Sequence, residues 1–483
     1  MKFNGLMIDC SRLIERHEYY FEMLDFMGEW KMNTLLFHFS DDFGCSIKLP
    51  GFEELAVPNS FSLEEVKALV CKAKSIGVDI IPEIETFGHT RYITDHSRYS
   101  KLRSNEKSDT LGLNALNPFI EESLEVVTRL IEAVSELFPS QYLHIGCDEV
   151  DLGELPEKYG VPPDEAWANY VNKVIGIARN ACKTPMIWAD HLANCDSILK
   201  HLRKDVILVD WRYACGGALG TDSFEPKRYS DAGFEDVLLS PAMAMFFHRW
   251  LPNKVALQNV KTCNEIASKN DLAGVISTIW VPFRYQRDTM YYGIAFSAYA
   301  AERGGVIDWN EFNTAFAEKV FGASLSPALK EFLTIWPDLI INHKISAKMI
   351  QEDSEFSETE IDILEQNLRN GDKILSLAKK FSPVKNIEIW NAMVLAAKAV
   401  WLCSQCYYAI HAEDHQTVIK TTELVNSIEK LIRELDDEWD RTRYPEDPQK
   451  STPRFTGWDE AYNLVFFNHL FKIIKNHAEI KEL

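Results

Sequence analysis

The sequence predicts an α/β fold, a (β/α)8 barrel followed by an α-helical C-terminal domain, and two observations support this prediction. Up to about residue 305, short apolar runs of strand length alternate with longer amphipathic stretches of helical period. From about residue 310 onward the strand pattern disappears and helical patterns dominate. We therefore expect a barrel domain over residues 1–308 and a helical domain over residues 309–483.

Eight apolar runs are the expected strands of the barrel, and amphipathic stretches separate them. The strands are expected at residues 5–9, 34–39, 79–82, 142–145, 186–188, 206–210, 236–239 and 275–280. The barrel helices are expected at residues 18–31, 63–75, 120–137, 164–181, 193–202, 257–269 and 290–302. Ser62 followed by Glu65 is typical of a helix N-terminus and supports the start of the second helix. The C-terminal helices are expected at residues 327–336, 358–380, 387–410, 418–435 and 459–474.

Composition excludes some classes of partner. The formal net charge is −21, which would repel nucleic acid and anionic membrane surfaces. No run of about 18 apolar residues is present, so we expect no membrane span. The first residues lack the pattern of a signal peptide, and the 10 cysteines are scattered along the chain. We expect reduced thiols and a cytoplasmic protein, with a processed secreted form as the alternative.

Polar and aromatic side chains gather where the expected strands end. In a parallel barrel these ends meet at one rim, which is where such folds place their functional residues. The rim residues are Asp9, Arg12, His38, Asp41, Asp42, Glu83, Glu85, His89, Asp148, Glu149, Trp188, Asp190, Asp210, Trp211 and Trp280. Any one of them could have a structural role, but their joint position at seven strand ends predicts a functional site.

The adjacent carboxylates Asp148 and Glu149 are the centre of this expected site. Tryptophan rings stack on sugar faces, Arg and Asp side chains bind hydroxyls, and a carboxylic acid protonates a leaving oxygen, so the set favours hydrolysis of a sugar linkage. The charge of Asp148 and the tryptophan surroundings are expected to raise the pKa of Glu149, as a general acid requires.

Metal-dependent hydrolysis is the competing interpretation of a rim rich in His and Asp. Its candidate ligands are His38, Asp41, His89 and His144. The first strand offers only Asp9 and Arg12 instead of a His-x-His pair, and His144 precedes its strand end, so it is expected inside the barrel wall. We therefore expect no metal and no other cofactor.

These residues resemble the glycoside hydrolase family 20 β-N-acetylhexosaminidases over roughly residues 1–305. The shared motifs are Asp9-x-Ser11-Arg12, Asn33 before His38…Asp41-Asp42, Pro82-Glu83-Ile84-x4-His89 and His144-x-Gly146-x-Asp148-Glu149, together with the tryptophans that end the later strands. Within the third motif, Glu85 and Phe87 replace the usual Asp and Pro. The α/β domain that often precedes the barrel in that family has no counterpart in this sequence, so we expect a compact form.

The resemblance implies an exo-acting enzyme that removes terminal β-linked GlcNAc or GalNAc from a glycan or glycoconjugate with retention of configuration. It implies that Glu149 acts as general acid and then base. Asp148 would orient the 2-acetamido group, whose carbonyl oxygen is the nucleophile and forms an oxazolinium ion. The implied substrate-binding residues are Arg12, Asp41, His89, Trp188, Trp211 and Trp280. Arg12 would hold ring hydroxyls, the tryptophans would form the walls, and His89 with Asp41 or Asp42 would steady Glu149.

One expected contact has no assigned residue. The Tyr-x-Asp that the family carries at strand seven is replaced by residues 245–249, Met-Phe-Phe-His-Arg. The hydroxyl donor to the oxazolinium oxygen is therefore left open between Tyr213, Tyr285 and Tyr292.

Two other functions and one other wall of the site stay open at this point. The chain could be a catalytically silent carbohydrate-binding barrel, or a glycosidase that uses Glu83 or Asp190 as a second carboxylate on a sugar without an acetamide. The aromatic and basic segment from Trp439 to Arg443 is expected in a loop between the last two helices. It is either a plain connection or a sugar-binding wall for its own rim or for that of a partner, since a homodimer through the helical domain is possible.

Overall fold

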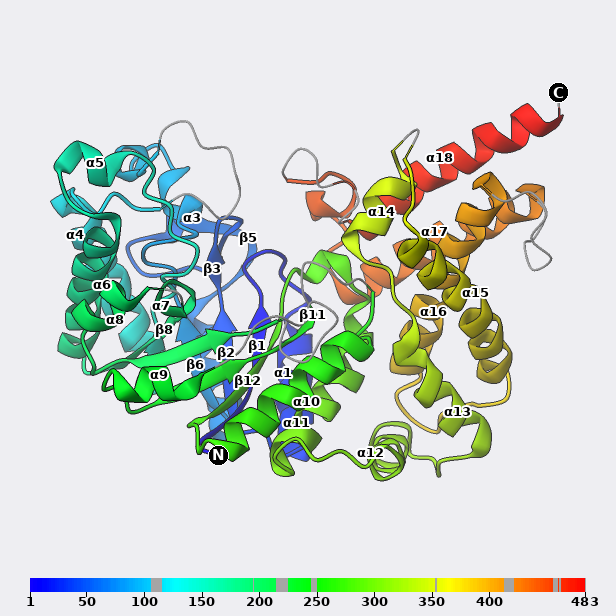
Figure 1. Cartoon of the computed structure of the whole chain (residues 1–483), viewed down its shortest axis with the longest axis horizontal. Coiled ribbons are helices and arrows are strands. Elements are labelled where there is room, and N and C mark those ends of the chain that lie inside the picture. Colours follow the sequence, from blue (N-terminus) through cyan, green and yellow to red (C-terminus); the bar gives the residue numbers. More distant parts are fainter. Residues whose placement is uncertain are drawn as a thin grey trace. The chain divides into compact units, whose positions relative to one another are not determined.

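Eight parallel strands form a closed barrel in the computed structural model, which describes residues 1–105, 115–193, 195–213, 225–244, 250–351, 354–411, 421–454, 459 and 462–482. The strands are β1 (Phe3–Asp9), β2 (Thr34–His38), β6 (Asp79–Glu83), β7 (Tyr142–His144), β8 (Thr184–Trp188), β9 (Ile207–Trp211), β10 (Val237–Ser240) and β12 (Gly274–Ile279). They pair in this order, and β12 pairs back with β1 (Figure 1). The predicted barrel and the order of its eight strands are confirmed.

The strands are almost continuously buried, as expected for a parallel sheet covered by helices. The described helices that follow them include α1 (Glu18–Glu29), α2 (Leu63–Ser75), α4 (Glu121–Leu137), α6 (Pro163–Asn180), α8 (Asp196–His201), α9 (Pro226–Asp231), α10 (Lys254–Lys269) and α11 (Met290–Glu302). At α2 the Ser62 hydroxyl accepts from the Glu65 N–H and the Glu65 carboxylate accepts from the Ser62 N–H, so the predicted capping box is present.

A small second sheet inserts after β2, and the sequence patterns did not predict it. It consists of β3 (Ser40–Asp41), β4 (Gly44–Ile47) and β5 (Ala56–Phe61). Gly44 has a φ of +148°, and a Cβ atom there would lie 2.1 Å from Cγ1 of Val57, so only glycine allows this approach of the strands. Strands of two to six residues are too short to produce a clear alternation of polar and apolar residues. The sheet is nevertheless important because it carries Asp41.

The chain forms two compact units. The first contains residues 1–242, 259–279 and 300–306, and the second contains residues 243–258, 280–299 and 307–483. The main change of unit therefore lies close to the expected boundary at residue 308, but two segments that flank β12 also belong to the second unit.

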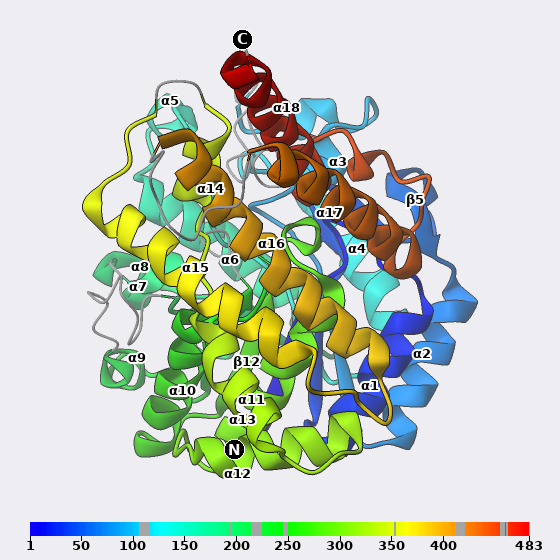
Figure 2. The ribbon, with the colours of Figure 1, turned by 90° about the vertical axis from the view of Figure 1, so that its right-hand side faces the viewer.

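The second unit is built mainly from helices. Beyond residue 307 they are α12 (Trp309–Phe316), α13 (Pro327–Ile335), α14 (His343–Met349), α15 (Glu358–Ala378), α16 (Ile387–His411), α17 (Thr421–Thr442) and α18 (Asn463–Glu482). Figure 2 shows α15, α16 and α17 side by side. By length and composition α16 could cross a membrane, but 61% of its apolar stretch is buried inside the structure, as is common for the core helix of a bundle.

Candidate active site

Four polar residues occupy equivalent levels at the ends of neighbouring strands. Asp9 on β1 pairs with His38 on β2, His38 with Glu83 on β6, and Glu83 with His144 on β7. All four side chains are buried. The barrel register therefore brings together residues that lie up to 135 positions apart, and it places them at the rim where the sequence predicted a site.

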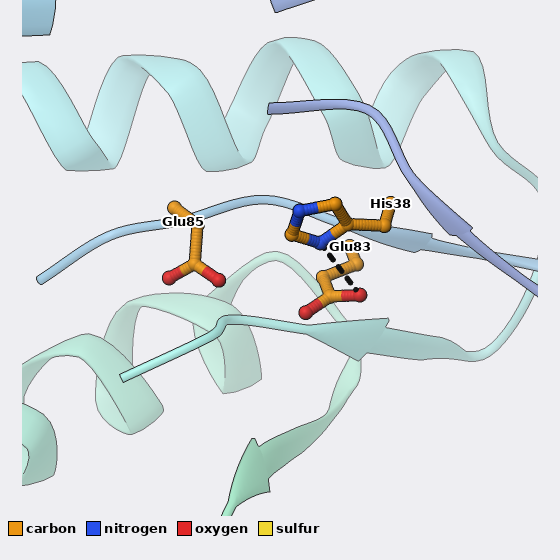
Figure 3. Close-up of side chains that lie close together, drawn as sticks. All are labelled: His38, Glu83 and Glu85. Carbon is orange, nitrogen blue, oxygen red and sulfur yellow. Dashed lines mark ion pairs between the residues drawn. The ribbon is translucent and has the colours of Figure 1, made fainter. Parts of the chain in front are cut away.

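His38 is a buried cation held between two carboxylates. Its Nδ1 atom lies 3.0 Å from Oε2 of Glu83, the pair drawn in Figure 3, and its Nε2 atom lies 3.2 Å from Oδ2 of Asp41. Burial opposes the charged form, but Glu83 and Asp41 outweigh it and raise the pKa of His38 to about 10.

Glu83 is anionic and fully buried. The Trp188 indole N–H donates to its Oε1 atom at 2.6 Å. Burial opposes ionisation, but His38 holds the pKa of Glu83 below its ordinary value. His144 is different, because burial lowers its pKa to about 4 and its Nδ1 atom accepts from the Gly146 N–H at 3.2 Å. Neutral His144 thus lies inside the barrel wall, as the sequence predicted.

The position of Trp188 differs from the expected one. Its ring is completely buried, it packs against His144 with ring centroids 4.5 Å apart, and its N–H is used by Glu83. This burial argues against the expected stacking on a sugar. It gives Trp188 an internal role, which is to orient Glu83 in the barrel core.

Arg12 extends from the end of β1 to two carboxylates. Its Nη1 atom lies 2.9 Å from Oδ2 of Asp9, and its Nη2 atom lies 2.7 Å from Oδ2 of Asp41. Burial raises the pKa of Asp41, but Arg12 and the histidines outweigh this effect and hold it well below its usual range. Asp41 is therefore a fixed negative charge, and Arg12 is pre-oriented with a small exposed fraction of its side chain, 12%.

His89 connects the carboxylates of the small sheet to the central pair. Its Nδ1 atom lies 3.3 Å from Asp42 and 3.6 Å from Asp41, and its Nε2 atom lies 3.2 Å from Glu149 and 3.6 Å from Asp148. Burial opposes protonation, but these carboxylates raise the pKa of His89 well above its ordinary value. The expected relay from Asp41 and Asp42 through His89 to Glu149 is present as a chain of contacts.

The pKa of Glu149 is shifted in the opposite direction to the expected one, and Asp148 is the carboxylate whose pKa is raised. Burial is the main cause that raises the pKa of Asp148 to about 7, and the charges of Asp190 and Glu149 add to it. The hydrogen bond from His89 is the main cause that lowers the pKa of Glu149, whose side chain is about half exposed, 49%. The expectation that the pKa of Glu149 is raised is therefore wrong, because the hydrogen bond and positive charge of His89 stabilise the ionised form of Glu149.

Asp190 and His191 support the backbone of the central pair. Asp190 accepts a hydrogen bond from the Glu149 N–H at 3.0 Å, and His191 accepts one from the Val150 N–H at 3.0 Å. Glu149 has a φ of +48°, which is uncommon for a residue with a side chain. Sequence reasoning named Asp190 only as an alternative second carboxylate and missed His191. Their place directly after β8 was the signal that could have found this role.

The later strand ends carry further polar and aromatic groups. Trp211 ends β9, is partly exposed, and contacts the ring of Tyr213 at 5.1 Å. Beside it, Asp210 accepts from the Tyr229 hydroxyl at 2.8 Å and pairs with Arg212 at 3.0 Å. Burial raises the pKa of Asp210 to about 6, against the opposing effect of Arg212.

Three expected participants lie in the second unit. Trp280 is partly exposed and directly follows β12. Tyr285 is buried, and Tyr292 is buried with its hydroxyl 3.0 Å from Oδ1 of Asn313. That contact gives Tyr292 an internal partner, so Tyr213 is the candidate donor with exposed surface in the first unit. Residues 245–249, where the family motif is replaced, lie outside the described residues.

Two groups of side chains have donor atoms of the kinds that metal ions use. Among the described residues they are His38 with Glu83 and Glu85, and Asp41 and Asp42 with His89, each with ligand atoms within 4.8 Å of one another. Both histidines are cations in ion pairs, whereas a metal ligand must be a neutral imidazole. A metal ion could therefore bind either group only after the histidine, His38 or His89, had lost its proton.

The segment from Trp439 to Arg443 is not the loop that the sequence predicted. Residues 439–442 form the last turn of α17, and Trp439 is buried. Arg443 is also buried, stacks on Trp439 at 4.9 Å, and donates to the carbonyl oxygens of Pro282 at 2.7 Å and Tyr285 at 3.3 Å. Arg441 pairs with Asp288. These contacts fix the end of α17 to the segment after β12, so a sugar-binding wall from this cluster is not supported.

Comparison with known proteins points in one direction. The family model "Glycosyl hydrolase family 20, catalytic domain" matches residues 1–275. A beta-hexosaminidase of Vibrio furnissii is 26% identical over 198 residues, which are 35% of this chain and 30% of that protein. Hexosaminidase D of Bos taurus is 29% identical over 198 residues, 37% of this chain and 55% of that protein. The chain thus spans less than two thirds of the length of these relatives.

Solved structures agree in fold. A GH20 exo beta-N-acetylglucosaminidase from Vibrio harveyi in complex with N-acetylglucosamine has a TM-score of 0.50 at 19% identity, over 64% of this chain and 56% of that one. A beta-N-acetylhexosaminidase from Bacteroides fragilis has a TM-score of 0.51 at 17% identity, over 66% and 69% of the two chains.

Proposed function

The chain belongs to glycosyl hydrolase family 20, and from this membership we propose that it is an exo-acting β-N-acetylhexosaminidase. It would release terminal β-linked GlcNAc or GalNAc by substrate-assisted, retaining catalysis. The observation that carries the proposal is the position of Asp148 and Glu149, which follow β7 at the barrel rim and share His89 as a common partner. One adjacent pair is sufficient because the substrate supplies the nucleophile from its own acetamide.

Each central carboxylate would have a distinct role. Glu149, with half of its side chain exposed, would protonate the leaving oxygen and later activate water. Asp148, whose buried Oδ1 atom has no hydrogen-bond partner in the described part of the chain, would accept the acetamide N–H and stabilise the oxazolinium cation. The Arg12 guanidinium, held by Asp9 and Asp41, would bind ring hydroxyls, and Trp211 would contact the sugar.

The low pKa of Glu149 is compatible with its role as an acid if the substrate changes its surroundings. A sugar placed over the exposed half of the side chain would remove water from it, and this desolvation raises the pKa of a carboxylic acid. Glu149 would therefore take up a proton when substrate binds.

The proposal is tested by hydrolysis of aryl β-GlcNAc, β-GalNAc and β-glucoside by the wild type and by Glu149→Gln. We expect release from at least one acetamido sugar and loss of that release in the variant. Cleavage of the glucoside without cleavage of either acetamido sugar would support a two-carboxylate glycosidase. Binding of all three without cleavage would support a silent carbohydrate-binding barrel.

We also propose that the protein is located in a reducing compartment, the cytoplasm. A second proposal is that it forms a homodimer through its helical region. The exposed thiols of Cys71 and Cys182, which form no disulfide, support the first point. Cell fractionation tests the compartment, and light scattering of the purified protein tests the dimer.

A further inference from the structure

Glu85 is a buried acid that the mechanism above does not use. We propose that it is held as a neutral carboxylic acid and that it positions Asp148 from inside the barrel. This inference rests on the proposed function, because it assigns Glu85 to the same site, but its charge state can be measured without substrate.

The first observation is that the carboxyl group of Glu85 is enclosed and has no partner. The residue is 1% exposed, and neither Oε1 nor Oε2 has a hydrogen-bond partner among the described residues. Its backbone is fixed at both sides, since the N–H donates to Oγ of Ser40 at 3.0 Å and the carbonyl accepts from the Tyr92 hydroxyl at 2.7 Å. The main chain at Glu85 is therefore fixed, and the carboxyl group is enclosed away from water.

The second observation is the contact with the turn that leads to Asp148. A Cβ atom on Gly146 would lie 1.9 Å from Oε2 of Glu85, so the carboxyl group occupies the space above this glycine. Gly146 has a φ of +66°, and two residues later the chain reaches Asp148. An aspartate at position 85 would be one methylene shorter and would leave this space empty, which gives the unusual glutamate a physical reason.

The third observation is the balance of charge around Glu85. The titratable groups that face it are Asp148, His89, Glu83, Asp41, His38, Cys147 and Tyr92. The cations of this set, His38 and His89, are already in ion pairs with other carboxylates, as Figure 3 shows for His38 and Glu83. Another buried negative charge would lack a cation to compensate it, and burial with the charge of Asp148 raises the pKa of Glu85 well above its ordinary value.

A neutral Glu85 has a consequence for the proposed reaction. Asp148 must be ionised to stabilise a cationic oxazolinium, and burial already raises its pKa to about 7. A second negative charge at position 85 would raise that pKa further and keep Asp148 protonated at neutral pH. The proton on Glu85 therefore allows Asp148 to carry its charge, while the side chain supports the turn at Gly146.

The charge state predicts how stability depends on pH. A folded-state pKa above the unfolded value means that the folded protein keeps a proton that the unfolded chain loses above about pH 4.3, so stability falls as pH rises. Glu85→Gln removes this dependence. We expect its melting temperature, relative to the wild type, to increase by about 2 °C or more between pH 5 and pH 8.

Glu83→Gln is the matched control, because Glu83 ends β6 two residues before Glu85 and is equally buried, but it is ionised. From pH 5 upward Glu83 is ionised in both the folded and the unfolded chain, so its own titration should leave the melting temperature of Glu83→Gln relative to the wild type nearly constant over this range. A flat or falling difference for Glu85→Gln would overturn the proposal. If the melting temperature of Glu85→Gln relative to the wild type falls, and chelation of divalent cations also lowers the stability of the wild type, Glu85 would instead be a ligand of a metal ion together with His38 and Glu83.

A second measurement covers the case in which Glu85→Gln does not fold. The wild type, labelled with 13C only in glutamate side chains, should show the infrared carbonyl band of a protonated glutamate at pH 8, and absence of this band would overturn the proposal. In the folded variant, the midpoint of the pH profile of kcat/KM should stay near that of the wild type, whereas an ionised Glu85 would make it fall. If the band is present but no acetamido sugar is cleaved, the proposed function is wrong, whereas the proposal that Glu85 is protonated still holds.

Discussion

The carboxylate of Asp190 accepts a hydrogen bond from the backbone N–H of Glu149 at 3.0 Å. This bond crosses from the end of β8 to the end of β7 and holds Glu149 in a left-handed conformation, φ +48°. The acid therefore depends on a neighbouring strand for its direction as well as on His89 for its charge.

The first prediction concerns this bond. Asp190→Ala removes the acceptor, so Glu149 can relax toward an ordinary conformation and its carboxyl group moves away from the leaving oxygen. Misplacement of about 1 Å lowers turnover about 100-fold, so we expect a fall in kcat of this size with a smaller change in KM. Steady-state kinetics on an aryl acetamido sugar measure it. Asp164→Ala, on the exposed surface of α6, is the control, and equal kcat values for all three proteins would contradict the role of Asp190.

The second prediction concerns the pH dependence of the reaction. Asp148 has a pKa of about 7, raised mainly by burial, and must be ionised to accept the acetamide N–H. Because Glu149, whose pKa is lowered, must also take up a proton, kcat/KM should stay level just below pH 7 and fall above about pH 7, where Asp148 no longer gains charge. Asp148→Asn should lower kcat by about 100-fold or more with little change in folding, and it should remove this break near pH 7. Unchanged turnover would exclude Asp148 from the mechanism.

Local patterns were sufficient to predict the barrel and many of the residues that lie at its rim. Each buried parallel strand is followed in the sequence by its own rim residues. The partners of each side chain were not predictable, since His38, Glu83 and His144 become neighbours only through the register of β2, β6 and β7. Burial determined which of the predicted binding residues can reach a substrate. Trp188 and Arg443 have the composition of binding residues, but both are used inside the protein. The pKa order of Asp148 and Glu149 likewise depends on which of them His89 and solvent reach.

The third prediction distinguishes an internal Trp188 from a sugar-stacking one. Trp188→Phe keeps an aromatic ring but removes the hydrogen bond to Glu83, which is charged and buried. We expect a loss of about 2 kcal/mol in stability, seen as a lower melting temperature, and a KM close to that of the wild type. Trp211→Phe is the comparison, since Trp211 is partly exposed and should affect KM without a large change in melting temperature. A tenfold higher KM for Trp188→Phe at unchanged stability would restore the stacking role.

The last prediction concerns the end of α17. Arg443 is buried and donates to the carbonyl oxygens of Pro282 and Tyr285. Arg443→Met keeps most of the packing volume but leaves these carbonyl groups without their donor, so we expect a loss of about 2 kcal/mol in stability. Thermal unfolding followed by circular dichroism measures it. Arg433→Ala is the control, because Arg433 lies on the exposed face of the same helix and pairs with Glu429 at 3.2 Å, and the loss of an exposed ion pair should change the melting temperature little. If Arg443→Met unfolds at the wild-type temperature but has a higher KM for a disaccharide, the cluster contacts sugar after all, and its proposed structural role is wrong.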